Sequence, residues 1–234
     1  MNVRKALNLS LDRNVITDKV LGQGQTPTYV FTPTYIEEGQ LIQQPAYSKE
    51  PMAQRNEEAI KLLEEAGYSK ANPLKFSILY NTNENHKKVA IAAASMWKAN
   101  TKGLIDVKLE NQEWKTYIDS RRAGRYDAAR AGWNADYNQA TTFGNYFLSN
   151  SSNNTAKYAN PEYDKAIAES YVATDAEGRA KAYAKAEEIL AKDFGIVPIF
   201  NYVNPRLVKP YVKGYSGKDP QDHIYLRNLY IIKH

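Results

Sequence analysis

No cysteine occurs among the 234 residues of the sequence. This absence excludes disulfide bonds, thiolate zinc sites and cysteine nucleophiles, while the cellular compartment stays open. The only histidines are His86, His223 and His234, which lie too far apart in sequence to form a metal-binding motif. No apolar stretch approaches the roughly 20 residues that a transmembrane helix needs. Residues 1–11 resemble a signal peptide only faintly, because polar residues interrupt the apolar run and no small-residue cleavage site follows.

The motifs of common enzyme classes are absent as well. Gly22-Gln23-Gly24 lacks a preceding strand and a further glycine, so it predicts a turn rather than a phosphate-binding loop. No serine lies in a nucleophile elbow. Asp127 and Asp136 could pair as acid and base, but their odd spacing places them on opposite faces of a continuous strand. We therefore expect no enzyme, no cofactor and no metal site.

The composition is that of a globular protein, with 43% hydrophobic and 24% charged residues. The formal net charge of +5 is dispersed along the chain and does not by itself indicate nucleic acid. A nucleic-acid site would combine arginines with stacking indole rings, namely Arg121, Arg122, Arg125 and Arg130 with Trp114 and Trp133. Because no recognised nucleic-acid-binding module accompanies them, this is the weaker alternative.

The spacing of apolar residues predicts alternating helices and strands, and hence an α/β fold. Helices are expected over residues 3–11, 12–21, 56–66, 86–100, 114–122 and 175–192, with a further helix starting at Asn160-Pro161. Strands are expected over residues 74–80, 104–109, 126–133, 196–203 and 225–233. Asn56 and Gly67 suit the two ends of the 56–66 helix. The strand, helix and strand across 74–109 form a βαβ unit, which predicts parallel pairing.

The most informative segment is residues 126–147, which begins like a strand and becomes a loop rich in aromatic and polar residues. Its apolar area comes from Trp133, Tyr137, Phe143 and Tyr146, and its donors and acceptors come from Arg130, Asn134, Asn138 and Asn145. Apolar walls with a few polar groups around one carboxylate, Asp136, are typical of a ligand site. The alternative is an ordinary aromatic core strand in which Asp136 caps a turn.

Four segments carry a resemblance to a known family. They are residues 112–117 (Gln-Glu-Trp-Lys-Thr-Tyr), 129–138 (Ala-Arg-Ala-Gly-Trp-Asn-Ala-Asp-Tyr-Asn), 148–152 (Leu-Ser-Asn-Ser-Ser) and 202–210 (Tyr-Val-Asn-Pro-Arg-Leu-Val-Lys-Pro). They closely resemble the periplasmic oligopeptide-binding proteins of ABC peptide importers, in extracellular solute-binding protein family 5. The match spans the whole chain and implies that the chain is only the C-terminal portion of such a protein.

The resemblance implies an α/β fold, with a mixed sheet flanked by helices, that forms the C-terminal lobe of a two-lobed, Venus-flytrap periplasmic binding protein. Residues 1–204 would be the ligand-binding lobe, and residues 205–234 a tail that returns to the other lobe. The family binds short peptides largely through their main chain and delivers them to ABC-transporter permease subunits. The implied partners are therefore peptides, the permease and the missing N-terminal lobe, but not nucleic acid.

The implied location is the periplasm, with a signal peptide expected on the full-length precursor. A different ligand, such as a murein peptide, a dipeptide or haem, is the alternative within the same family. Without the other lobe, Leu226, Leu229 and Ile231 would have no sheet to join. We therefore expect the tail to pack irregularly, to pair with another copy of the chain, or to be mobile.

The resemblance also assigns roles to individual residues. Asp136 matches an aspartate that pairs with the free α-amino group of the peptide, a desolvated charge pair that fixes the peptide's register. Trp133 and Trp114 match aromatic walls of side-chain pockets. The groups that would meet the peptide carboxylate, or the solvent around it, are Arg130, Arg121 and His86.

The remaining assignments include two departures from the family pattern. Tyr202 and Asn204 lie where the chain crosses between lobes, and Tyr202 matches a ligand-contacting tyrosine. Asn134 replaces a cysteine of close relatives, although its main-chain role could persist. Leu21 stands where relatives have a lysine used for longer peptides, which puts a preference for longer peptides in doubt.

Overall fold

The computed structural model describes residues 1–219 and 221–234, so that Pro220, which falls within the tail, lies outside the described residues. At its centre lies a sheet with the strand order β3-β2-β4. Its strands are β2 (Leu74–Asn81), β3 (Ile105–Gln112) and β4 (Ala128–Ala129). Both neighbours pair with β2 in parallel. The parallel βαβ unit expected from the sequence is thus confirmed.

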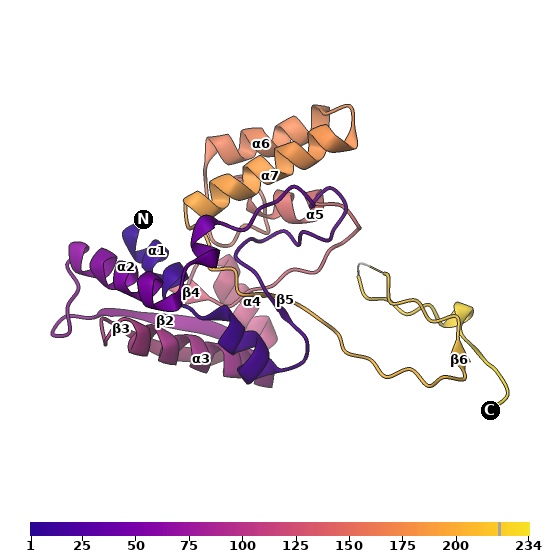
Figure 1. Ribbon diagram of the computed structural model, residues 1–234, viewed down its shortest axis with the longest axis horizontal. Coiled ribbons are helices and arrows are strands. Elements are labelled where there is room, and N and C mark those ends of the chain that lie inside the picture. The colour runs from indigo at the N-terminus through magenta and orange to yellow at the C-terminus, as the bar shows by residue number, and fades with distance from the viewer. Residues whose placement is uncertain (220) are drawn as a thin grey trace.

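Helices pack against this sheet (Figure 1). Helix α3 (Glu84–Asn100) connects β2 to β3 and shares one core with α1 (Asn2–Leu9) and α2 (Met52–Glu65), since the indole of Trp97 in α3 donates to the carbonyl of Leu7 in α1. Asn83 caps α3 by accepting hydrogen bonds from the main-chain N–H groups of Asn85 and His86. The first core cluster joins all of these elements, with fully buried Leu9, Leu63 and Ile105 at its centre.

Two helix starts near the N-terminus test the sequence prediction. The side chain of Asp12 accepts the N–H of Val15 at 3.2 Å, ahead of the π-helical segment η1 (Val15–Leu21), as expected. Asn56 was predicted to cap its helix, and this is wrong, because α2 already begins at Met52. Pro51 precedes that first residue in an extended conformation, where its missing N–H costs nothing. Gly67 does end the segment in a left-handed conformation, with a φ of 88°.

A second layer of helices packs beside the sheet domain. It contains α5 (Thr141–Gly144), the 3-10 turn η3 (Asn145–Phe147), α6 (Pro161–Val172) and α7 (Ala176–Lys192). The side chains of Asn160 and Asp175 cap α6 and α7. The core of this layer is aromatic and includes Phe143, Phe147, Tyr163 and Tyr183.

Two expected strands are much shorter than predicted. Within residues 126–133 only β4 pairs, and within 196–203 only β5 (Phe200–Asn201) pairs, antiparallel to β1 (Thr26–Pro27). After β4, the N–H of Arg130 still donates to the carbonyl of Leu79 at 2.8 Å, and the chain then leaves the sheet. Helix α4 (Trp114–Arg122), by contrast, has the predicted bounds.

Residues 205–234 leave the body as an extended tail (Figure 1). The predicted continuous strand over 225–233 is wrong, because η4 (Leu226–Asn228) forms a 3-10 turn within it. Only β7 (Tyr230–Ile231) pairs, antiparallel to β6 (Val212–Lys213) of the same tail and outside the main sheet. Leu226 and Ile231 are 76% and 69% exposed, so the apolar side chains of the tail lack a covering layer here.

A fully buried arginine ties the two crossing segments together. Arg13 donates from Nε to the carbonyl oxygens of Thr28, at 3.0 Å, and Pro198, at 2.7 Å. These carbonyls lie next to β1 and β5, so one side chain holds both segments. Its guanidinium also lies 4.0 Å from the centre of the Tyr29 ring. Burial lowers the pKa of Arg13 to about 10, which keeps the group charged at neutral pH.

We predict that Arg13→Met lowers the free energy of unfolding by about 3 kcal/mol, because buried carbonyl oxygens lose their donor. Urea denaturation measures the change. Arg4→Met is the matched control, since exposed Arg4 also donates to two carbonyl oxygens, those of Phe194 and Asp193. The control change should stay below about 1 kcal/mol. Equal effects of the two substitutions would contradict the role of Arg13.

Candidate ligand-binding site

The carboxyl ends of the three parallel strands meet at one edge of the sheet and carry three predicted site residues. His86 follows β2, Trp114 follows β3, and Arg130 directly follows β4. In open α/β sheets, ligands bind outside the carboxyl ends of the strands. The topology therefore gathers residues that are up to 44 positions apart in sequence at an edge suited to a ligand.

Asp136 lies in the exposed loop that continues from Arg130, and a threonine holds it. The hydroxyl of Thr142 donates to Oδ2 of Asp136 at 3.1 Å and accepts the main-chain N–H of Asp136 at 3.0 Å. The same hydroxyl oxygen lies 3.5 Å from the indole Nε1 of Trp133. Thr142 is buried, whereas Asp136 is exposed. Sequence analysis missed Thr142, because no motif marks a hydroxyl that follows a carboxylate by six positions.

Arg130 and Tyr202 come together across the loop. The guanidinium of Arg130 donates to the hydroxyl of Tyr202, and its main-chain carbonyl accepts the hydroxyl of Tyr117. Tyr202 also covers Gly132, where an added Cβ would lie 2.7 Å from its Cζ atom. Only a glycine at position 132 leaves room for this close approach. The segment after β5 thus reaches the loop that contains Gly132.

His86 lies close to this group but is uncharged at neutral pH. Its Nδ1 lies 2.9 Å from Oδ1 of Asn81, the last residue of β2. Burial, and secondly the charge of Arg130, lower the pKa of His86 to about 4. If the neutral ring donates from Nδ1 to the amide oxygen of Asn81, its Nε2 is left as an acceptor. Arg130 is therefore the cationic member of this pair.

The remaining predicted site residues lie in different surroundings from one another. Arg121 donates to the hydroxyls of Tyr146, at 2.9 Å, and Thr155, at 3.0 Å, and thus links two loops. Trp114 is 59% exposed, with its ring centre 5.8 Å from that of Tyr117. Of the other two predicted site residues, Asn134 is exposed, and Asn204 donates to Asp222 in the tail.

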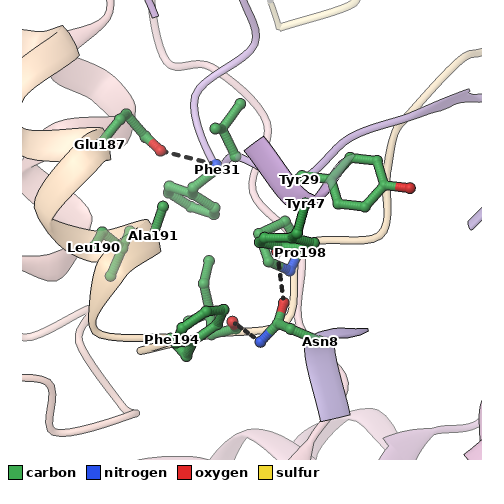
Figure 2. A pocket seen from close by; sticks show the side chains of 11 residues that line it. Asn8, Tyr29, Phe31, Tyr47, Glu187, Leu190, Ala191, Phe194 and Pro198 are labelled. Carbon is green, nitrogen blue, oxygen red and sulfur yellow. Dashed lines mark hydrogen bonds between the residues drawn. The ribbon is translucent and has the colours of Figure 1, made fainter. Parts of the chain in front are cut away.

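An enclosed cavity lies elsewhere, between α7 and the segment that follows β1 (Figure 2). Its volume of about 10 Å³ holds one water molecule at most. Glu187 accepts the N–H of Phe31 at 3.0 Å beside it, and burial raises the pKa of that carboxyl. None of the predicted site residues lines the cavity. The candidate site at the sheet edge therefore lies apart from this cavity.

Among residues 1–219 and 221–234, no group of three or more histidine, aspartate or glutamate side chains could hold a metal ion. No helix in the same ranges is long and apolar enough to cross a membrane. The carboxylate of Asp127 accepts the N–H group of Ser77 at 2.8 Å and the hydroxyl of Ser77 at 3.1 Å. Asp127 is thus bonded to β2 rather than paired with Asp136.

The sequence pattern of the bacterial extracellular solute-binding proteins, family 5 (middle), matches residues 1–155. The chain belongs to this family. Over all 234 residues it is 97% identical to the periplasmic oligopeptide-binding protein OppA of Haemophilus influenzae, of which it spans 43%. It is 45% identical over 232 residues to the periplasmic murein peptide-binding protein MppA of Escherichia coli, again spanning 43% of that protein.

The solved structure of H. influenzae OppA in complex with RPPGFSPFR matches with a TM-score of 0.93 and 96% identity. That match covers 99% of this chain and 45% of the other. The chain therefore spans less than half the length of each of these relatives. The α/β architecture expected for a lobe of a periplasmic binding protein is confirmed, with parallel pairs in the main sheet and antiparallel pairs in the two small ones.

We predict that the ring protons of His86 titrate near pH 4 rather than at the ordinary value of 6.5. Because the folded-state pKa is lowered, protonation opposes folding. The folded state is therefore more stable when the His86 ring is neutral. This stability is fully present above pH 6.5 and is lost as the pH falls toward 4. An NMR titration of the His86 ring measures the midpoint.

The control is Arg130→Met, which removes one cause of the shift and should raise the His86 midpoint. A midpoint near 6.5 in the unaltered chain would contradict the half-buried, Asn81-bonded placement of His86.

Proposed function

We propose that this chain carries about half of a binding site for short peptides. It would belong to a periplasmic protein that delivers these peptides to an ABC-transporter permease. The observation that carries the proposal is the exposed carboxylate of Asp136, held by Thr142 beside the indole of Trp133. A carboxylate fixed next to an aromatic wall suits a protonated α-amino group followed by a side chain. Its relatives are solute-binding proteins, one of them in complex with RPPGFSPFR.

The charges of the loop suit the two ends of a zwitterionic ligand. Asp136 supplies the negative charge, and Arg130, six residues earlier, supplies the positive one. Arg121 donates to two hydroxyls, those of Tyr146 and Thr155, whereas Arg130 donates to one, that of Tyr202, so Arg130 is the better candidate for the peptide carboxylate. His86 would contribute a neutral ring nitrogen. Trp114, Asn134, Tyr202 and Asn204 complete the proposed set.

Main-chain recognition accounts for the small number of charged groups in the proposed site. A peptide bound as an added strand gains affinity from N–H and C=O groups that every sequence possesses. Aromatic surfaces such as Trp133 and Trp114 accept side chains of varied shape. The similarity to MppA favours a murein peptide as the second candidate ligand. Asp136 does not separate the two, since both ligand classes are peptides.

Residues 205–234 have a different proposed role from residues 1–204. The tail's exposed apolar residues, among them Leu226 and Ile231, would be covered by the part of the longer relatives that this chain does not span. Within the described residues, the hydrogen bonds of the tail join tail residues to one another or to Asn204. The ligand-binding lobe would thus be stable without it.

The peptide proposal predicts a dependence on the free amine. Tri-alanine should shift the indole N–H signals of Trp133 and Trp114 in NMR spectra, and N-acetyl-tri-alanine should shift them at least tenfold less per unit concentration. Asp136→Asn should remove the difference between the two ligands, because the amide carries no charge.

Trp97 is the internal control, since its buried indole donates to the carbonyl of Leu7 inside the core, at 2.9 Å. Equal shifts with both peptides in the unaltered chain would refute the role of Asp136. A lack of shifts with either peptide would refute the proposal that this chain carries part of a peptide-binding site.

For the tail, we predict that a chain ending at Asn204 keeps the free energy of unfolding of the body within about 0.5 kcal/mol. The reason is that the hydrogen bonds of the tail do not reach the body beyond Asn204. Urea denaturation followed by tryptophan fluorescence measures it, since all three tryptophans lie in residues 1–204. A loss of several kcal/mol would show that the tail is part of the same folding unit.

A further inference from the structure

Thr142 contacts both the carboxylate and the main chain of Asp136 through a single hydroxyl group. We infer that Thr142 is a positioning residue that directs the carboxylate of Asp136 toward the ligand's amine. This inference rests on the proposed function, in which Asp136 pairs with that amine. Neither the sequence motifs nor the family resemblance assigns a role to Thr142.

The hydrogen-bonding capacity of the hydroxyl is fully used. A threonine hydroxyl offers one proton and two lone pairs. The proton goes to Oδ2 of Asp136, one lone pair takes the N–H of Asp136, and the other faces the indole Nε1 of Trp133 at 3.5 Å. Oδ2 keeps one lone pair after it accepts this proton, and no hydrogen bond from the described residues reaches Oδ1, so the carboxylate of Asp136 can still receive a ligand's ammonium group.

The packing around α5 keeps this hydroxyl in place. Thr142 is 5% exposed, and its neighbour Phe143 lies in the aromatic core with its ring centre 5.4 Å from that of Phe31. At the end of the same short helix, the carbonyl of Gly144 accepts the hydroxyl of Tyr163 at 2.7 Å. Thr142 thus belongs to a rigid element, whereas Asp136 lies in an exposed loop.

Positioning matters because an exposed aspartate otherwise samples several rotamers. Selecting one rotamer upon binding costs free energy, and a preformed bond that holds the carboxylate removes part of that cost. The N–H bond from Asp136 also fixes the main chain that carries the carboxylate. Trp133, held by the same oxygen, keeps its ring beside the anion.

The test compares Thr142→Val, which keeps the shape and removes the hydroxyl, with Thr142→Ser, which keeps the hydroxyl and removes the methyl group. The readout is the initial slope of the Trp133 indole shift against tri-alanine concentration. Thr142→Val should reduce this slope about tenfold, whereas Thr142→Ser should keep it within about threefold of the unaltered chain. N-acetyl-tri-alanine should bind all three chains equally weakly.

A second readout needs no ligand. In Thr142→Val, the main-chain amide signal of Asp136 and the indole signal of Trp133 should both move, while in Thr142→Ser both should stay. The buried Trp97 indole, which bonds to Leu7, reports whether the fold is intact in each variant.

The outcomes separate the inference from the proposed function. If Asp136→Asn abolishes the preference for the free amine and Thr142→Val does not, the role of Thr142 is refuted while that of Asp136 stands. If Asp136→Asn keeps the preference, or if tri-alanine produces no shift, the proposed function falls and the inference falls with it. Loss of the preference in Thr142→Val, with rescue in Thr142→Ser, supports both.

Discussion

Parallel pairing of β2 with both of its neighbours is the constraint on which the candidate site depends. Main-chain hydrogen bonds along β2 place the ends of β3 and β4 at the same edge, where Trp114 and Arg130 follow those ends and His86 follows the end of β2. Their gathering is a consequence of register, since a shift of either neighbour would move its site residue along the edge. The main-chain pairing thus determines which side chains come together in the candidate site.

Buried charged groups then hold the irregular segments in place. Arg13 joins the segments next to β1 and β5, and Glu187 of α7 binds the N–H groups of Phe31 and Thr32. A third buried charge, Glu38, pairs with Arg179 of α7 at 2.6 Å. Glu38 also accepts the side-chain amide of Gln139, close to the loop that carries Asp136. Unpaired, such groups would be costly, so each one specifies where a long loop must lie. These contacts hold the loops around the candidate site in place.

The sequence predicted the regular part of the fold because the rules for that part are local. Helix caps such as Asn160 and Asp175, the βαβ unit and the bounds of α4 follow from residues close in sequence. Two predictions failed elsewhere. Helix α2 begins directly after Pro51, earlier than predicted, and the strand at β4 ends early near the place where Tyr202 crosses over Gly132. For the site, composition indicated the loop and the family resemblance indicated the roles. The roles of Arg13 and Thr142 were not predicted. No periodic sequence pattern marks a buried cation bonded to carbonyl oxygens, or a hydroxyl bonded to several groups.

The central claim is that Asp136 receives the amino end of a peptide while Arg130 faces the carboxylate end. The most direct measurement is the set of intermolecular nuclear Overhauser effects between the chain and a tripeptide whose first and last residues carry distinct isotope labels. The account predicts contacts from the first residue to the indole protons of Trp133, and from the last residue to the ring of Tyr202, which lies against Arg130. Contacts in the reverse order, with the last residue at Trp133, would contradict it.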